Sequence, residues 1–333
     1  MNVFVLTEGG KKIGFGHIAR CLSLCQAFEE FGTVPEFIVN GDETIKDLLS
    51  DRKYLSLNWI EDIKVLDVLQ GADIVVIDSY MADLRIYLKV CDAVKISVYL
   101  DDNKRLDYPA GIVINGGIDA EMLGYIKREG ISYLLGPGYA PLRKAFWDVT
   151  EKEIRENIGT IMVTFGGDDI RNLTPGVLEL LVDEYPGVCK EIVIGKGFSN
   201  SVRIKAAADK NTRLHYNLDA EAMLGLMLGS DVAISAGGQT LYELARVGVP
   251  AIAIAVADNQ INNIKGWQHA GCIEYAGWWE DGGVFNKMAN SLKTVKGQDV
   301  RTKLSQTGRY LVDGRGAKRA VGYIVNGVYN KLI

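Results

Sequence analysis

Residues 3–31, VFVLTEGGKKIGFGHIARCLSLCQAFEEF, decide the fold. The stretch begins with an apolar run at Val3–Leu6, passes through glycines at 14 and 16, and continues as an amphipathic segment over His17–Phe31. In that segment apolar residues recur three and four positions apart, which is the pattern of a helix with one buried face. A strand, a glycine turn and a helix in this order predict a βα unit of a parallel sheet.

The same pattern recurs in two series along the chain. In the first half it predicts further strands at Glu36–Val39, Ile74–Ile77, Ile96–Leu100 and Ile112–Ile114. A second series starts near Thr160 and predicts strands at Ile161–Phe165, Glu191–Ile194, Arg213–Tyr216, Val232–Ser235 and Ala251–Ala255. We therefore expect two doubly wound α/β domains that face each other across a cleft, because such sheets bind ligands at the carboxyl ends of their strands.

The length of 333 residues is about twice that of a common single domain and also favours two domains. We expect one domain over residues 1–150 and one over 151–333, joined by a charged connection around 145–158. The last segment, Ala317–Ile333, carries an apolar stripe that includes Val328 and Leu332. It predicts a terminal helix that docks on another element, and docking back is one option for it.

Composition excludes several classes of protein. The net charge of -5 divides into -6 for residues 1–150 and +1 for the remainder, which argues against a nucleic-acid partner. Five scattered cysteines favour reduced thiols and a cytoplasmic location, and Cys21 and Cys25 fit a helix core better than a metal site. The longest apolar run, Pro250–Ala257, is far shorter than the ~20 residues of a membrane span, so we expect no membrane insertion.

The first glycine turn, Gly14-Phe-Gly-His17, is a candidate catalytic element. Gly14 and Gly16 allow the backbone to approach a ligand closely, and His17 opens the following helix. The positive end of the helix dipole disfavours a protonated imidazole there, which suits a general base. The alternative is a helix-cap histidine that packs on the sheet.

Two glycine turns in the second half are candidate nucleotide sites. Gly166 and Gly167 follow the strand Ile161–Phe165, and the turn either approaches a nucleotide or is only a tight connection. The stretch from Ser235 to Glu243, SAGGQTLYE, leads from a strand into a helix, so its free N–H groups and the helix dipole predict a diphosphate site. Glu243 either reaches a ribose or lies on a solvated helix face.

Two further groups of polar residues follow strands. Asn259 and Gln260 come after the strand at 250–256, where amides either fix sugar hydroxyls or cap the next helix. Tyr80 ends the motif Asp78-Ser-Tyr80 and either faces the cleft or is a half-buried core tyrosine.

Taken in register, these motifs resemble the bacterial and archaeal UDP-sugar hydrolases of the pseudaminic acid pathway and the related spore-coat polysaccharide proteins. The resemblance runs nearly end to end. It includes IGFGHIAR (13–20), DSY (78–80), GYAPLR (138–143), FGGD (165–168), SAGGQTLYE (235–243), Asn259-Gln260 and DGRGAKR (313–319). It implies the GT-B fold, and a metal-independent and cofactor-free hydrolysis of UDP-2,4-diacetamido-2,4,6-trideoxy-β-L-altropyranose.

The resemblance also implies a role for each matching residue. His17 would be the catalytic base that activates water. Substrate would be bound by Gly14, Gly16, Arg20, Tyr80, Arg143, Asn259 and Gln260, and the nucleotide by Gly166, Gly167, Ser235, Gly237, Gly238, Gln239, Thr240 and Glu243. The chain departs from the family where Leu6 and Glu8 replace an arginine and an aspartate, and where Ser79 replaces a histidine.

The sequence leaves other functions open. A GT-B glycosyltransferase could use the same fold and a UDP-sugar donor with a soluble or cell-envelope acceptor. A non-hydrolysing epimerase is also compatible with the motifs. A sugar-nucleotide binding protein without turnover would not need His17, Arg20 and Tyr80. An NAD-dependent oxidoreductase is disfavoured, because no G-x-G-x-x-G follows the first strand with an acidic residue about 20 positions later.

Overall fold

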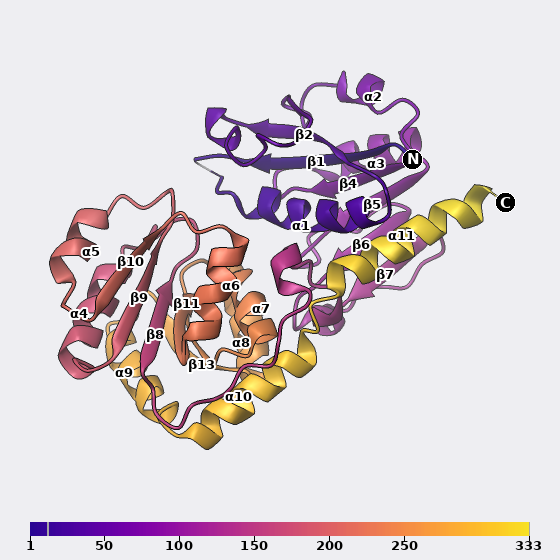
Figure 1. Cartoon of the computed structure of the whole chain (residues 1–333). Coiled ribbons are helices and arrows are strands. Elements are labelled where there is room, and N and C mark those ends of the chain that lie inside the picture. Colours follow the sequence, from indigo (N-terminus) through magenta and orange to yellow (C-terminus); the bar gives the residue numbers. More distant parts are fainter. Residues whose placement is uncertain (12, 333) are drawn as a thin grey trace. The chain divides into compact units, whose positions relative to one another are not determined.

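The structure is a computed structural model and describes residues 1–11 and 13–332. The chain forms two compact units (Figure 1). Unit 1 comprises Met1–Lys144 and Arg315–Ile333, and unit 2 comprises Ala145–Gly314. The chain thus enters unit 2 after Lys144 and returns after Gly314, so the last helix belongs to unit 1.

Unit 1 is built on a parallel sheet, which in the described residues has seven strands in the order β3-β2-β1-β4-β5-β6-β7. Both faces of its centre are covered, which is why β4 is a continuous buried run, IVVID. The strands are β1 (Val3–Gly9), β2 (Glu36–Gly41), β3 (Tyr54–Ser56), β4 (Ile74–Asp78), β5 (Ile96–Leu100), β6 (Gly111–Asn115) and β7 (Ile131–Leu135).

Two long helices pack together on unit 1. Helix α1 (Gly16–Glu30) contacts β1 and α11 (Gly316–Leu332), and Figure 1 shows α1 and α11 along the same sheet. Ala320, Val321 and Ile324 of α11 are fully buried, whereas the side chains of Val328 and Leu332 lie outside the described residues. Helices α2 (Val65–Val68) and α3 (Leu84–Ala93) complete the unit, with short 3₁₀ turns that include η3 (Pro137–Tyr139).

Unit 2 repeats this architecture. Its parallel sheet has, over the described residues, six strands in the order β10-β9-β8-β11-β12-β13. The strands are β8 (Thr160–Thr164), β9 (Cys189–Ile194), β10 (Thr212–Tyr216), β11 (Val232–Ala236), β12 (Ala251–Ala255) and β13 (Ile273–Trp278). The helices are α4 (Thr174–Glu184), α5 (Ser201–Ala207), α6 (Ala220–Gly229), α7 (Thr240–Val247), α8 (Asn259–His269), α9 (Val284–Thr294) and α10 (Gln298–Leu311).

The predicted fold class, two α/β domains with parallel sheets, is confirmed. Every predicted strand is present, with ends that differ by up to three residues. Strands β3, β7 and β13 were not predicted. None of the helices in the described part of the chain combines the length and the apolarity that a membrane crossing requires.

Candidate active site

A group of polar side chains gathers at one edge of the unit 1 sheet. Strands β1 and β4 pair in parallel with Thr7 opposite Asp78, and β5 lies on the other side of β4. Because neighbouring parallel strands end at the same edge, Glu8, Asp78 and Asp102 come close together there. Helix α1 follows β1 and begins at this edge, which adds His17 and Arg20 to the group.

His17 and Asp78 form a hydrogen-bonded pair. His17 is the second residue of α1, and its Nδ1 lies 2.7 Å from Oδ1 of Asp78. Burial opposes ionisation of Asp78, but the interactions with Arg20 and His17 outweigh it and hold the pKa of that carboxyl at about 2. An ionised carboxylate can only accept, so Nδ1 of His17 carries a proton, and in the neutral imidazole the lone pair is on Nε2. Asp78 therefore fixes the tautomer that a general base requires.

Arg20 ties Asp78 to a second carboxylate. Its Nε donates to Oδ2 of Asp78 at 2.8 Å, its Nη2 donates to Oδ1 at 2.7 Å, and its Nη1 donates to Oδ1 of Asp102. Burial opposes the charge of the guanidinium, but Asp102 and Asp78 outweigh it and raise the pKa of Arg20 further. This bidentate geometry is the strong form of an ion pair and fixes the Asp78 carboxylate in position.

Tyr80 lies over the imidazole on the solvent side of the group. Its ring meets that of His17 edge to face, with centroids 4.6 Å apart and an interplanar angle of 88°. Its hydroxyl donates to Oδ2 of Asp102. Tyr80 is 38% exposed, so it is not the core tyrosine of the alternative interpretation.

Glu8 occupies the position beneath Tyr80. Its Oε1 accepts from the backbone N–H of Tyr80 at 2.8 Å and of Met81 at 3.3 Å, and its Oε2 accepts from the Ser79 hydroxyl at 2.5 Å. The same Oε1 lies 4.0 Å from Nε2 of His17. Glu8 is 1% exposed, so a buried carboxylate faces the free nitrogen of the imidazole.

The glycine turn next to this group borders open space. A Cβ atom at Gly14 or Gly16 would meet no atom within 4 Å. Gly14 also has a φ of +89°, which side-chain-bearing residues rarely adopt, and its N–H donates to the carbonyl of Gly10 at 2.7 Å. The helix-cap interpretation of His17 fails, because the N-cap residue of α1 is Phe15 and no side chain caps it.

Arg143 lies at the other end of α1. The backbone N–H of its neighbour Lys144 donates to Gln26 at 2.7 Å, and the Lys144 ammonium pairs with Glu30 at 2.9 Å. His17 and Gln26 are separated by roughly 14 Å along the helix axis. The structure therefore brings Arg20 and Tyr80 to His17, whereas the neighbour of Arg143 contacts the opposite end of α1.

In unit 2 the turn after β11 is braced by helix α8. Oε1 of Gln260 accepts from the N–H groups of Gly237 at 3.2 Å and Val256 at 3.1 Å. Asn263 donates to the carbonyl of Gly237 at 2.9 Å and accepts from the Tyr242 hydroxyl at 2.6 Å. Gln260 thus holds the glycine turn through its carbonyl oxygen.

The remaining predicted residues of this turn surround the beginning of α7. Ser235 is buried at the end of β11, and Gly238 and Gln239 precede Thr240, the first residue of the helix. Glu243 is 4% exposed, which rules out the solvated helix face that the sequence left open. Asn259 is the first residue of α8 and is exposed.

The turn after β8 reaches the same edge of the unit 2 sheet. Strands β8 and β11 pair in parallel, with Ser235 opposite Thr164. A Cβ atom at Gly166 or Gly167 would meet nothing within 4 Å, and the Gly167 carbonyl accepts from Gly197 N–H at 2.9 Å. The two glycine turns therefore lie side by side; Gly237 is buried, whereas Gly167 is exposed and Gly166 and Gly238 are partly exposed.

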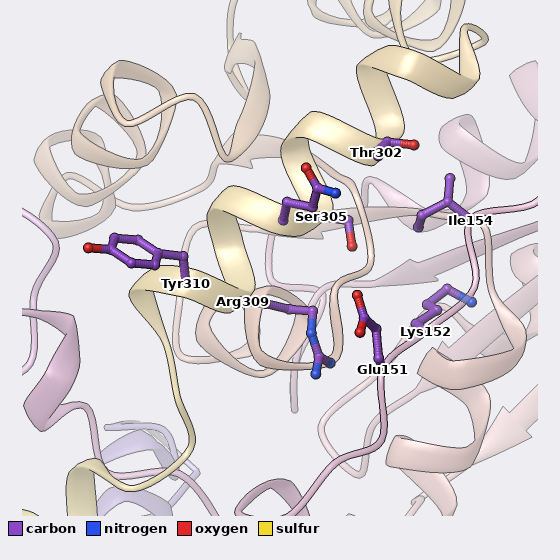
Figure 2. Close-up of a pocket in the computed structure, with 8 residues that line it drawn as sticks. Glu151, Lys152, Ile154, Thr302, Ser305, Arg309 and Tyr310 are labelled. Atoms are coloured by element: carbon purple, nitrogen blue, oxygen red, sulfur yellow. The ribbon is translucent and has the colours of Figure 1, made fainter.

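Two cavities lie elsewhere. One of about 510 Å³ in unit 2 lies between α10 and residues 151–154, and Figure 2 shows Arg309 and Glu151 in its wall. The Arg309 guanidinium donates to the carbonyls of Thr150, Arg246 and Val247. The other, of about 580 Å³ in unit 1, is lined by residues that include Met81, Asp83 and Leu88. Neither contains a predicted site residue.

Comparison with known proteins tests the predicted resemblance. Spore coat polysaccharide biosynthesis protein SpsG of Bacillus subtilis is 25% identical to this chain over an alignment of 347 positions. The alignment covers 97% of this chain and 98% of that protein. The UDP-2,4-diacetamido-2,4,6-trideoxy-beta-L-altropyranose hydrolase of Campylobacter jejuni is 26% identical, covering 78% of this chain and 93% of that protein. The predicted resemblance is confirmed. No family profile matches the chain.

Two other relatives are longer proteins. One is a Helicobacter pylori protein named as both a pseudaminic acid cytidylyltransferase and the same hydrolase. It is 23% identical to this chain, and the alignment covers 82% of this chain and 48% of that protein. The chain also spans 55% of an uncharacterized protein of Methanocaldococcus jannaschii, at 25% identity over 76% of this chain. The chain therefore spans about half the length of these two relatives.

Solved structures establish the fold type. MurG of Acinetobacter baumannii superposes with a TM-score of 0.68 at 13% identity, covering 98% of this chain and 100% of that one. The Staphylococcus aureus MnaA–UDP structure superposes with a TM-score of 0.66 at 14% identity. The superposition covers 100% of this chain and 98% of that one. The fold is therefore of the GT-B type, as predicted.

The sequence patterns did not point to two carboxylates of the site, nor to the full role of a third. Asp102 was not singled out, Glu8 was noted only as a departure from the family, and Asp78 was noted only as the start of a motif. Each stands at or just after the carboxyl end of β1, β4 or β5. A search for acidic residues at predicted strand ends could have found them.

Proposed function

We propose that the protein is a nucleotide-sugar hydrolase. It releases UDP from UDP-2,4-diacetamido-2,4,6-trideoxy-β-L-altropyranose, or a close relative, in pseudaminic acid biosynthesis. The observation that carries the proposal is the His17–Asp78 pair at the edge of the unit 1 sheet, with Nδ1 held by an ionised carboxylate at 2.7 Å. The names of the Campylobacter and Helicobacter relatives support the substrate.

The chemistry requires one proton transfer. Nε2 of His17 accepts a proton from water, and the water oxygen attacks the anomeric carbon with inversion. The C1–O bond breaks and its electron pair leaves with UDP. Asp78 stabilises the imidazolium that forms, as the carboxylate does in a catalytic triad.

Residues of unit 2 would bind the leaving group, UDP. The N–H groups of Gly238 and Gln239 precede α7, where backbone donors and the helix dipole favour a diphosphate. Glu243 would bind the ribose, and Asn259 the substituents of the sugar. These groups can absorb the charge of UDP without a dedicated acid, so we expect turnover to persist in EDTA.

Incubation of the purified full-length chain with the UDP-sugar alone, in ¹⁸O-labelled water, tests this function. We expect release of UDP and of a free sugar that carries the label at C1 with inverted configuration. Label in UDP would mean attack at phosphorus and would remove His17 from its role. Strict dependence of UDP release on an added acceptor would identify a glycosyltransferase instead.

A further inference from the structure

The buried carboxylate of Glu8 has one unused acceptor position. A carboxylate can accept about four hydrogen bonds. Ser79, Tyr80 and Met81 supply three donors to Glu8. In the part of the chain that the structure describes, the one basic side chain within 4.0 Å of Glu8 is His17, and that group is charged only when protonated. A buried carboxylate without a permanent cation is costly, which calls for a compensating role.

The position of Glu8 relative to His17 suits one water molecule. Two hydrogen bonds of about 2.8 Å, donated by the two hydrogens of a single water, span acceptors roughly 4.4 Å apart. Oε1 of Glu8 and Nε2 of His17 are 4.0 Å apart. In the turn that precedes His17, a Cβ atom at Gly14 or Gly16 would meet no atom within 4 Å.

From this geometry we infer that Glu8 is a second acceptor for the attacking water and selects water over alcohols as the nucleophile. The inference rests on the proposed hydrolase function. Water donates one hydrogen to Nε2 of His17 and the other to Oε1 of Glu8, which directs its lone pair away from both acceptors. An alcohol has a single O–H group and cannot satisfy both.

The step is balanced without a further reactant. The water oxygen bonds to C1 as the C1–O bond to UDP breaks and its electron pair leaves with UDP. One proton passes to Nε2 of His17, and the second stays on the new hydroxyl, hydrogen-bonded to Glu8. The imidazolium that results is flanked by Asp78 on its Nδ1 side and by Glu8 on its Nε2 side.

The Glu8→Gln variant removes the charge of the Glu8 side chain and leaves its size and shape nearly unchanged. Its carbonyl can still accept from Tyr80 and Met81, so a residue that only holds this loop would leave kcat unchanged. We expect kcat to fall by roughly tenfold to a hundredfold, the rate equivalent of one hydrogen bond to a charged group, with KM within about threefold. An unchanged kcat overturns the inference.

Two control variants separate charge from structure. Glu191 of unit 2 is also a buried carboxylate beside a histidine, with its Oε2 at 2.5 Å from Nε2 of His215. Glu191→Gln should leave kcat within about twofold of the wild-type value. Ser79→Ala removes the donor to Oε2 and also the hydroxyl that accepts from Met81 and Ala82 N–H. If this variant loses as much kcat as Glu8→Gln, Glu8 merely holds the loop and the inference is overturned.

A measurement on the wild-type enzyme remains decisive if the glutamine variant does not fold. In water–methanol mixtures, the fraction of methyl glycoside among the products should fall well below the mole fraction of methanol. Methyl glycoside in proportion to methanol overturns the inference while hydrolysis itself stands. Absence of UDP release without an acceptor overturns both, so the two failures are distinguishable. Where Glu8→Gln folds, its methyl glycoside fraction should rise severalfold above that of the wild type.

Discussion

The imidazole of His17 donates from Nδ1 to Oδ1 of Asp78 across 2.7 Å, which links the first turn of α1 to the last residue of β4. Arg20 holds the same carboxylate from the next turn of α1. The base, its orienting carboxylate and the cation that fixes the carboxylate therefore come from two adjacent elements of one rigid sheet edge. This arrangement pre-organises the base without a contribution from a loop.

The first prediction concerns His17. His17→Ala should lower kcat by about 10²–10⁴-fold, the usual contribution of a general base. The affinity for UDP should stay within about twofold, because the proposed diphosphate turn lies in unit 2. Steady-state kinetics and calorimetric titration with UDP measure the two quantities. A loss of UDP affinity that matches the loss of kcat would argue against the assignment.

The second prediction concerns the acid stability that Asp78 confers. Its pKa is held at about 2, below the ordinary 3.8, so its contribution is present above about pH 4 and is lost as the pH falls towards 2. The difference of about two pKa units corresponds to roughly 2.5 kcal/mol. The gap in free energy of unfolding between the wild type and Asp78→Asn should shrink by that amount across this window.

Urea unfolding at pH 6, 4, 3 and 2 checks this, with unit 1 followed through hydrogen exchange of peptides from α1 and β4. The same peptides report on the region that Asp78 stabilises, and those of unit 2 serve as an internal control. A gap that stays constant from pH 6 to pH 2 would contradict the assigned pKa direction.

Most strands were predictable because they are buried on both faces. A run such as IVVID in β4 has no polar face and is apolar throughout. Strand β3 has three residues, two of them exposed, and offers no such signal. In β13 the pairing with β12 shifts at Ala253–Ile254, and Gly277 has a φ of +110°, so a glycine and an irregular register interrupt the apolar pattern.

The sequence alone singles out candidate residues where a residue type stands next to a glycine turn, as with His17 and the Gly237–Gly238 turn. It was not predictable where the contact depends on strand order. Asp102 looks like a loop residue in the sequence, and only the order β1-β4-β5 places it beside Arg20 and Tyr80. The bracing of Gly237 by Gln260 likewise depends on how α8 packs, which one sequence does not reveal.

The third prediction concerns the shared carboxylate of Asp102. It accepts from both Tyr80 and Arg20, and its side chain is 35% exposed. Asp102→Asn should raise KM by about threefold to tenfold with a smaller change in kcat, because a partly solvated hydrogen bond contributes less than a buried one and Asp102 does not touch His17.

Tyr80→Phe removes the other half of the same hydrogen bond. The double variant should therefore lose little more kcat/KM than either single variant, and a double-mutant cycle measures this coupling. Additive losses would mean that Tyr80 and Asp102 act separately.

The last prediction uses two adjacent glycines with opposite surroundings. A Cβ atom at Gly237 would lie 2.3 Å from Cδ1 and 2.4 Å from Cγ1 of Ile264, which is fully buried, and 3.1 Å from Cβ of Gln260. At Gly238 it would meet nothing within 4 Å.

Gly237→Ala should destabilise unit 2 by about 1–3 kcal/mol, the cost of overpacking, and should weaken UDP binding because α8 or the turn must move. Gly238→Ala should leave the unfolding free energy within about 0.5 kcal/mol. Thermal unfolding and UDP titration of the pair measure both effects, and equal stability of the two variants would show that α8 does not constrain the turn.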